Sequence, residues 1–223
     1  MQNPPPVGKA WFHSLRSVRP IRRNFGLDSG GQCVDRYYIE RFLDARSADV
    51  KGRVLEIGDN AYTMRYGGAK VTRSDVLHAR PGNSAATIVG DLSTGQGIPD
   101  GAFDCMILTQ TLPFIYDVEG TIRTIHRLLA PGGVALLTMS GISQISRYDM
   151  EQWGDFWRFT AMSAERLFTE VFQPERVTVE AHGNVLAAVA FLHGIVVSEL
   201  KPEELDFRDP DYEVTITLRA VKE

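Results

Sequence analysis

Short apolar segments alternate with helical segments from residue 53 onward, and this alternation limits the fold more than any other feature. The apolar segments predict seven strands, at residues 53–57, 70–74, 86–90, 104–109, 134–139, 177–181 and 214–220. Helical periodicity precedes and separates them, at residues 34–45, 61–66, 118–129, 164–172 and 185–200. Because parallel strands are joined by crossovers of about a dozen residues or more, the pattern predicts an α/β fold with helices on both faces of the sheet.

Outside the alternating segments, the sequence predicts an N-terminal arm and a segment that covers an edge of the sheet. Its 223 residues suit one full-sized domain with added segments. Residues 1–33 form a basic, Pro-containing N-terminal arm, and residues 34–223 form the domain. The stretch 140–160 holds two of the three tryptophans and has no clean periodicity, so we expect it to cover an edge of the sheet. The acidic stretch 199–213 is expected to turn in solvent before the last strand.

The arm concentrates positive charge on a chain whose net charge is −4. Residues 1–27 contain no acidic residue and five basic ones, Lys9, Arg16, Arg19, Arg22 and Arg23. Such an arm could contact phosphate, a membrane surface or the acids of its own domain. Aromatic residues do not alternate with these charges, so nucleic acid is not an expected partner. We expect the arm to be solvated or docked on the domain.

Composition excludes several classes of protein. Hydrophobic residues at 43% and charged residues at 23% are typical of a water-soluble globular chain and not of a fibrous or disordered one. The longest apolar run, residues 185–197, is interrupted by His193 and Gly194, so no membrane span is expected. The N-terminus has no apolar signal core, which favours a cytoplasmic protein. Cys33 and Cys105 lack metal-ligand spacing.

The residues that follow the strands indicate where a ligand binds, because ligands of open α/β sheets lie outside the carboxyl ends of the strands. Gly58 follows the first strand and permits a tight turn and close ligand approach, and the next helix would offer free N–H groups to an anion. Asp75 follows the second strand, where a carboxylate can accept hydrogen bonds from ribose hydroxyls. Asp91 follows the third and could receive an exocyclic amino group, while Leu92 covers a base. Together they predict a track for an adenosine.

Five segments in order resemble the class I S-adenosylmethionine-dependent methyltransferases. They are Glu56-Ile57-Gly58, Ser74-Asp75-Val76, Gly90-Asp91-Leu92, Phe103-Asp104-Cys105-Met106-Ile107-Leu108 and Leu128-Leu129-Ala130-Pro131-Gly132-Gly133. Residues 153–160 and 183–188 further resemble a branch associated with glycosyltransferases and polysaccharide synthesis. The resemblance implies a single-domain, seven-stranded, mostly parallel sheet of the Rossmann-like methyltransferase type, whose last 41 residues resemble that family's closing strand pair.

The first loop departs from the family's acid-x-Gly-x-Gly-x-Gly pattern. Asn60 and Tyr62 occupy the second and third glycine positions. Asn enters left-handed backbone geometry readily, so the turn can survive, whereas Tyr62 must point away from the ligand or stack on it. The departure also argues against a nicotinamide cofactor, because a pyrophosphate needs closer backbone approach than one carboxylate does.

The resemblance also implies roles for individual residues. The loop of Gly58, Asp59 and Asn60 would touch the methionyl part of S-adenosylmethionine, and Glu56 would brace that loop. The other contacts it implies are Asp75 and Val76 at the ribose, Asp91 and Leu92 at the adenine, and Gln110 and Thr111 beside the sulfonium and the acceptor. The helix at residues 34–45 would close over the cofactor through Tyr37, or simply pack on the sheet.

Methyl transfer requires few catalytic side chains, because the sulfonium methyl is already activated and the site mainly aligns the reactants. His182 ends the sixth strand and is our candidate general base for a hydroxyl acceptor. In the cover, Asp155 and Arg158 could orient a polar acceptor, and Trp153 and Trp157 could stack on a sugar or fill the core. The fourth strand ends without an acid, so no catalytic metal is expected.

We therefore expect a methyltransferase that O-methylates a small polar acceptor such as a sugar or glycan precursor. Two alternatives stay open. A degenerate, non-catalytic module could bind S-adenosylmethionine without turnover, as the changes at Asn60 and Tyr62 suggest. A nicotinamide-dependent oxidoreductase is the other alternative, and it is less favoured.

Overall fold

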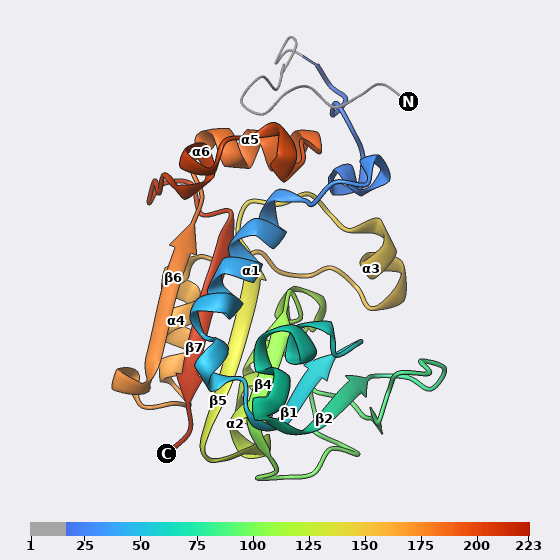
Figure 1. Cartoon of the computed structure of the whole chain (residues 1–223), viewed down its shortest axis with the longest axis vertical. Coiled ribbons are helices and arrows are strands. Elements are labelled where there is room, and N and C mark those ends of the chain that lie inside the picture. The colour runs from blue at the N-terminus through green and yellow to red at the C-terminus, as the bar shows by residue number, and fades with distance from the viewer. Residues whose placement is uncertain (1–16) are drawn as a thin grey trace.

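The computed structural model of the chain describes residues 17–223, so Lys9 and Arg16 of the arm lie outside the described residues. Its centre is a seven-stranded sheet in the order β3-β2-β1-β4-β5-β7-β6 (Figure 1). Neighbouring strands are parallel except that β7 runs antiparallel to both β5 and β6. The predicted α/β fold class and the seven strands are therefore confirmed.

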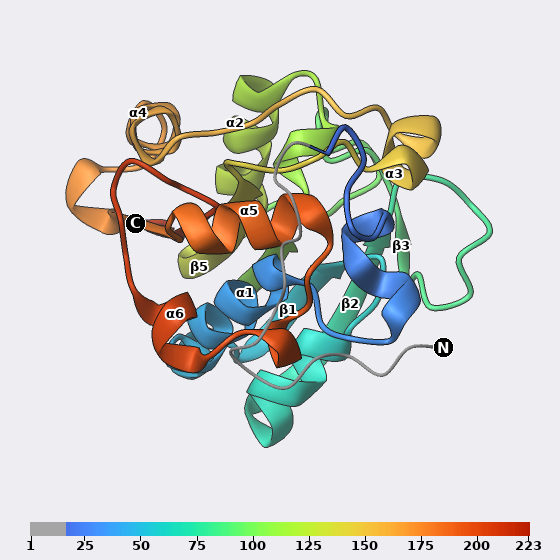
Figure 2. The same ribbon diagram turned by 90° about the horizontal axis from the view of Figure 1, so that it is seen from above.

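The strands and helices alternate along the chain as the apolar pattern predicts. The strands are β1 (Gly52–Ile57), β2 (Val71–His78), β3 (Ile88–Val89), β4 (Phe103–Thr109), β5 (Leu129–Ser140), β6 (Val177–His182) and β7 (Thr215–Val221). The α-helices are α1 (Val34–Ala45), α2 (Val118–Leu128), α3 (Arg147–Gln152), α4 (Ala161–Thr169), α5 (Val185–His193) and α6 (Pro202–Asp206). Helix α1 covers one face of the sheet, and α2 and α4 cover the other (Figures 1 and 2).

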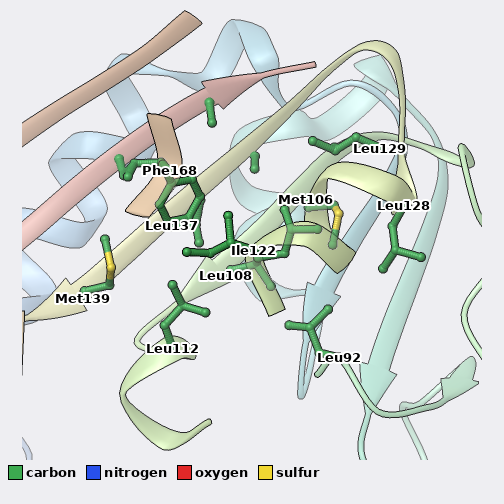
Figure 3. Close-up of a cluster of buried hydrophobic side chains, with 14 of the residues drawn as sticks. Leu92, Met106, Leu108, Leu112, Ile122, Leu128, Leu129, Leu137, Met139 and Phe168 are labelled. Atoms are coloured by element: carbon green, nitrogen blue, oxygen red, sulfur yellow. The ribbon is translucent and has the colours of Figure 1, made fainter. Parts of the chain in front are cut away.

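The alternating side chains of β4 divide the core between these two faces. Met106 and Leu108 point toward α2, where they pack with Ile122 and Leu137 (Figure 3). Cys105 and Ile107 point to the other face, where a second cluster contains Ile39 and Leu43 of α1. Because successive strand residues face opposite sides, one continuous apolar run supplies both layers, as expected for a strand buried on both faces.

Several predicted boundaries were wrong. Strand β5 begins at Leu129 instead of residue 134, β3 spans only Ile88–Val89 instead of 86–90, and α4 spans Ala161–Thr169 instead of 164–172. Three other differences are larger or have a clear local cause. Strand β2 continues to His78 instead of ending at Ser74, because Leu77 still pairs with Ile57 of β1. The helix expected at residues 61–66 is a short irregular segment with a π-helical turn at Thr63–Gly67. The helix expected at residues 185–200 ends at His193, because Gly194 takes a left-handed conformation with φ of 69°.

A layer of helices lies over the carboxyl ends of the parallel strands. Helix α5 crosses the sheet there, beside the start of α1 and the chain that precedes it (Figures 1 and 2). In that preceding chain, Arg22 donates two hydrogen bonds to Glu199, at 2.6 and 2.9 Å, and the Glu199 side chain is 1% exposed. At this residue the arm docks on the domain. Within residues 17–223, no helix has the length and apolarity needed to cross a membrane.

Candidate functional site

A large cavity opens at the carboxyl ends of β1, β2, β4 and β5. Its volume is about 1120 Å³, which is above the roughly 300–1,000 Å³ of common small-molecule sites. Strand-end residues form its floor, and residues from 143–158 and from the start of α1 form its walls. The polar and small floor residues are Gly58, His78, Gly90, Asp91, Thr109, Gln110 and Ser140. The cavity therefore lies where strand order predicts a ligand, beside the point at which the chain leaves β1 and β4 in opposite directions.

Gly58 gives the cavity an open backbone surface directly after β1. Its φ is 81°, in the left-handed region, and a Cβ placed on it would meet no atom within 4 Å. The Gly58 N–H donates to the carbonyl of Leu77 at 3.0 Å, and its own carbonyl accepts a 2.6 Å hydrogen bond from Asn83. A ligand can thus approach this backbone closely.

Glu56 braces the loop from beneath, as expected. Its carboxylate, 4% exposed, accepts the backbone N–H groups of Tyr62 at 3.2 Å and Thr63 at 2.7 Å. Burial raises the pKa of Glu56, although these N–H groups act in the opposite direction. Because Glu56 takes these donors, the expectation that the helix after β1 offers them to an anion was wrong.

Asp59, Asn60 and Tyr62 turn away from the cavity and do not line it. Asp59 accepts the N–H of Ala61 at 2.9 Å, and Asn60 donates to the hydroxyl of Ser74 at 3.1 Å. The Tyr62 ring packs against Tyr66, with 6.0 Å between the ring centroids. The sequence left two possibilities for Tyr62, stacking on the ligand or pointing away from it, and in the structure Tyr62 points away from the cavity.

Asp75 is not at the end of β2, and its expected place on the rim was wrong. It lies inside the strand, 1% exposed, and accepts hydrogen bonds from Arg53 at 2.7 Å, Thr87 at 3.0 Å and Arg73 at 3.2 Å. Burial opposes the charged form, but these hydrogen bonds outweigh it and lower the pKa of Asp75. Neither Asp75 nor its buried neighbour Val76 lines the cavity.

His78 occupies the strand end that the sequence assigned to Asp75. Its Nδ1 lies 2.6 Å from the carbonyl oxygen of Arg80, and its ring packs edge-on against Trp153 of the cover, 5.4 Å between centroids. The guanidinium of Arg80 lies 4.8 Å from the centre of the Trp153 ring. Pro81 and Gly82 form a turn signal just beyond, which could have placed the strand end later than Ser74.

Asp91 and Leu92 follow β3 and line the cavity as expected. One carboxylate oxygen of Asp91 accepts both the backbone N–H and the hydroxyl of Ser93, at 2.8 and 2.7 Å. Leu92 is 5% exposed and joins the core on the α2 side (Figure 3). The second oxygen of Asp91 is left without a protein donor among the described residues, so it can accept from a ligand.

Gln110 and Thr111 also line the cavity, at the end of β4. Gln110 has a positive φ of 50°, and its Oε1 accepts a 2.7 Å hydrogen bond from Ser140. Its Nε2 is buried and has no partner within residues 17–223. A left-handed conformation is uncommon for a residue with a side chain, and it marks a constrained position. The orphaned amide is a donor held ready for an acceptor inside the cavity.

An ion pair with a buried carboxylate and a partly exposed guanidinium braces the cover, residues 143–158. Asp155, with a side chain 1% exposed, binds Arg158 through both oxygens and accepts the N–H of Ser146 at 3.0 Å. Arg158 also donates to the carbonyl of Gln144 at 2.7 Å. Both charged residues line the cavity, but they are engaged with each other.

Tyr37 and His182 lie outside the cavity. The Tyr37 hydroxyl donates to Asp206 at 2.8 Å. His182 ends β6 as predicted, but its Nε2 lies 3.0 Å from the Thr217 hydroxyl and its ring stacks on Tyr38. Burial, with a contribution from nearby positive charge, lowers the pKa of His182 to about 4. Strands β5 and β7 separate β6 from β4, which explains why a shared sheet edge does not bring His182 to the site.

Two further residues, Asp35 and Arg36 in the first turn of α1, line the cavity and were not predicted. Their positions depend on how α1 packs across the sheet. The charged pair at the start of a helix is the only local signal, and it is common in helices that bind nothing.

The site contains features that suit an adenosyl cofactor. Gly58 presents open backbone, Gln110 presents a buried donor without a partner, and Asp91 presents a carboxylate oxygen. The volume exceeds that of common single-ligand sites, so it leaves room for a second molecule beside the cofactor.

Comparisons with known proteins agree with this geometry. The family model described as "Methyltransferase domain" matches residues 34–176. A search among curated protein sequences found no match. A S-adenosylmethionine-dependent methyltransferase from Archaeoglobus fulgidus is 9% identical, with a TM-score of 0.56, 90% of this chain covered and 100% of that one.

Two other solved structures are similar at comparable levels. A S-adenosylmethionine-dependent methyltransferase from Thermotoga maritima is 15% identical, with a TM-score of 0.54 and coverages of 85% and 92%. The N-methyltransferase NodS from Bradyrhizobium japonicum, in complex with S-adenosylhomocysteine, is 14% identical, with a TM-score of 0.52 and coverages of 91% and 94%. At these identities the likeness concerns the fold, and the family match adds the activity. The chain belongs to the methyltransferase-domain family and is a class I S-adenosylmethionine-dependent methyltransferase.

Proposed function

We propose that the cavity binds S-adenosylmethionine across the ends of β1, β2 and β4, and that the protein transfers the methyl group to a hydroxyl of a sugar or glycan precursor. The observation that carries this proposal is the composition of one cavity. Its floor has the strand-end groups that suit an adenosyl cofactor, and exposed aromatic side chains stand at its mouth.

Four floor residues would hold the cofactor. Gly58 would lie against its methionyl part, Asp91 would accept from the adenine amino group, and Leu92 would cover the base. The Nδ1 of His78 lies 2.6 Å from the carbonyl oxygen of Arg80 and 3.4 Å from its backbone nitrogen, so Nε2 is the ring nitrogen left for a ligand. A ribose hydroxyl can both donate and accept, so it suits Nε2 in either tautomer. His78 therefore takes over the role that the sequence suggested for Asp75.

The acceptor would bind at the mouth of the cavity. Tyr116, Tyr148 and Phe156 line the cavity, and their exposed fractions are 72%, 73% and 48%. Trp157 stacks on Tyr116, with 5.9 Å between centroids, and extends this aromatic surface. Exposed aromatic rings combined with a few polar groups suit a ligand that has both apolar C–H faces and hydroxyls. A sugar has this character.

The bound cofactor supplies an activated methyl group, so the chain contributes alignment and the exclusion of water. Such positioning contributes about 7–11 kcal/mol in favourable cases. The proton that the acceptor hydroxyl loses on transfer would pass to water at the mouth of the cavity, so the proposal needs no general base at His182.

Methyl transfer from labelled S-adenosylmethionine to a panel of acceptors tests the function. The panel contains mono- and oligosaccharides, nucleotide sugars, amino sugars and simple amines, because several structural neighbours are named N-methyltransferases. We expect Phe156→Ala to raise KM for the saccharide about tenfold without changing the affinity for S-adenosylhomocysteine. Phe207→Ala, an exposed aromatic outside the cavity, is the matched control and leaves KM unchanged. Transfer to amines alone, or equal effects of both variants, contradicts the proposed acceptor.

A further inference from the structure

In the loop after β1 and the segment that follows it, residues 58–64, only the N–H groups of Asp59 and Asn60 have no protein acceptor among the described residues. Glu56 and Asp59 together accept the N–H groups of the first three residues of the following segment, 61–63. The next N–H, that of Met64, donates to the carbonyl of Asn60. The Gly58 carbonyl already accepts from Asn83. The methionyl end of the cofactor carries both a carboxylate and an ammonium group, so it needs charge partners from another element.

Helix α1 provides an unpartnered carboxylate on the cavity wall. Asp35, in its first turn, lines the cavity and is 9% exposed. Its Oδ1 is buried and has no hydrogen-bond partner within the part of the chain that the structure describes. A buried carboxylate oxygen without a donor is destabilising unless a ligand satisfies it.

The next residue, Arg36, provides a positive charge on the same wall. Its one side-chain hydrogen bond within residues 17–223 runs from Nη1 to the hydroxyl of Tyr62, at 3.0 Å. A guanidinium has five N–H donors, so most of them are left for a ligand. Tyr62 is one of the two residues that replace glycines in the loop. The loop's departure from the glycine pattern and the orientation of Arg36 are therefore connected.

We infer that Asp35 and Arg36 form a clamp for the amino-acid end of the cofactor, with Asp35 holding the ammonium group and Arg36 the carboxylate. The clamp rests on the proposed cofactor site. Tyr62 acts as a positioning residue, because its hydroxyl orients the Arg36 guanidinium. The pair adds from α1 two formal charges, which the backbone of the loop after β1 cannot supply.

Calorimetric binding of three ligands to the full chain tests the clamp. S-adenosylhomocysteine carries both charged groups, its decarboxylated analogue lacks the carboxylate, and 5′-methylthioadenosine lacks both. We expect Arg36→Gln to weaken S-adenosylhomocysteine at least tenfold while leaving both other ligands within twofold. Asp35→Asn should weaken S-adenosylhomocysteine and its decarboxylated analogue at least tenfold and leave 5′-methylthioadenosine within twofold. Arg41→Gln, an exposed arginine of the same helix outside this cavity, is the matched control and changes none of the three.

Two results overturn the clamp. If a variant weakens the binding of all three ligands equally, its residue stabilises the cavity wall and does not bind the amino-acid end of the cofactor. If neither variant changes binding of S-adenosylhomocysteine, the amino-acid end lies elsewhere. Thermal unfolding of each variant separates a local loss from misfolding. Failure of the wild-type chain to bind any of the three ligands refutes the cofactor site itself, and is thus distinct from failure of the clamp.

Discussion

Replacing Asp75 with Asn separates a structural role for this carboxylate from a ligand-binding one. The substitution keeps the shape of the side chain and removes its charge. Arg73 is 61% exposed, so solvent limits its contribution to about 1 kcal/mol or less. Arg53 is 24% exposed and lies 2.7 Å from the carboxylate, which is typical of a charged hydrogen bond contributing about 1.5–3 kcal/mol. We therefore expect Asp75→Asn to lower the free energy of unfolding by about 2–4 kcal/mol.

For a domain of this size the loss corresponds to a Tm lower by about 5–15 °C, measured by calorimetry at pH 7. The affinity for S-adenosylhomocysteine, measured well below that Tm, should stay within twofold of the wild type. The pKa of Asp75 is lower in the folded chain than in the unfolded one. Its stabilisation is therefore complete above the unfolded pKa of about 3.9 and is lost as the pH falls through the folded pKa. The difference in Tm between the two proteins should shrink below about pH 4. An unchanged Tm with tenfold weaker binding would refute this reasoning and would indicate that Asp75 binds the ribose.

The other predictions concern the loop, the distant histidine and the cover. Gly58→Ala should cost about 1–2 kcal/mol of stability, because φ is positive there, and should weaken S-adenosylhomocysteine in calorimetry because the new methyl group points into open space. Unchanged binding would show that the ligand does not approach this backbone. His182→Gln should retain methyl transfer, and it should remove a destabilisation that the wild type suffers as the pH falls from 6.5 toward about 4, since the folded pKa of His182 is depressed. An inactive but folded variant would restore His182 as a base. Asp155→Asn should weaken the pairing with Arg158 and speed proteolysis within residues 143–158, with a raised KM for the acceptor; equal cleavage rates would contradict the bracing role.

Much of the architecture can be predicted from the sequence because it depends on local periodicity. The apolar runs of β1, β4 and β6 and the helical spacing of α1 and α2 lie close to their predicted positions. The brace at Glu56 was expected from the resemblance to the methyltransferase family, and the carboxylate does accept the N–H groups of Tyr62 and Thr63. Gly58, Asp91 and Gln110 line the cavity because they directly follow strands that share one edge.

The sequence by itself determined the order and approximate positions of the strands, and the tertiary structure decided where β2 ends and which strand ends share a cavity. Asp75 became structural because Arg53, on the neighbouring strand, neutralises it and allows β2 to continue to His78. His182 lies away from the site because β5 and β7 come between its strand and β4. Arg36 reaches the cavity through the packing of α1 on the sheet and its hydrogen bond to Tyr62, 26 residues later in the chain. Each of these outcomes depends on contacts between residues far apart in the sequence, and such contacts exist only after strands and helices have packed together.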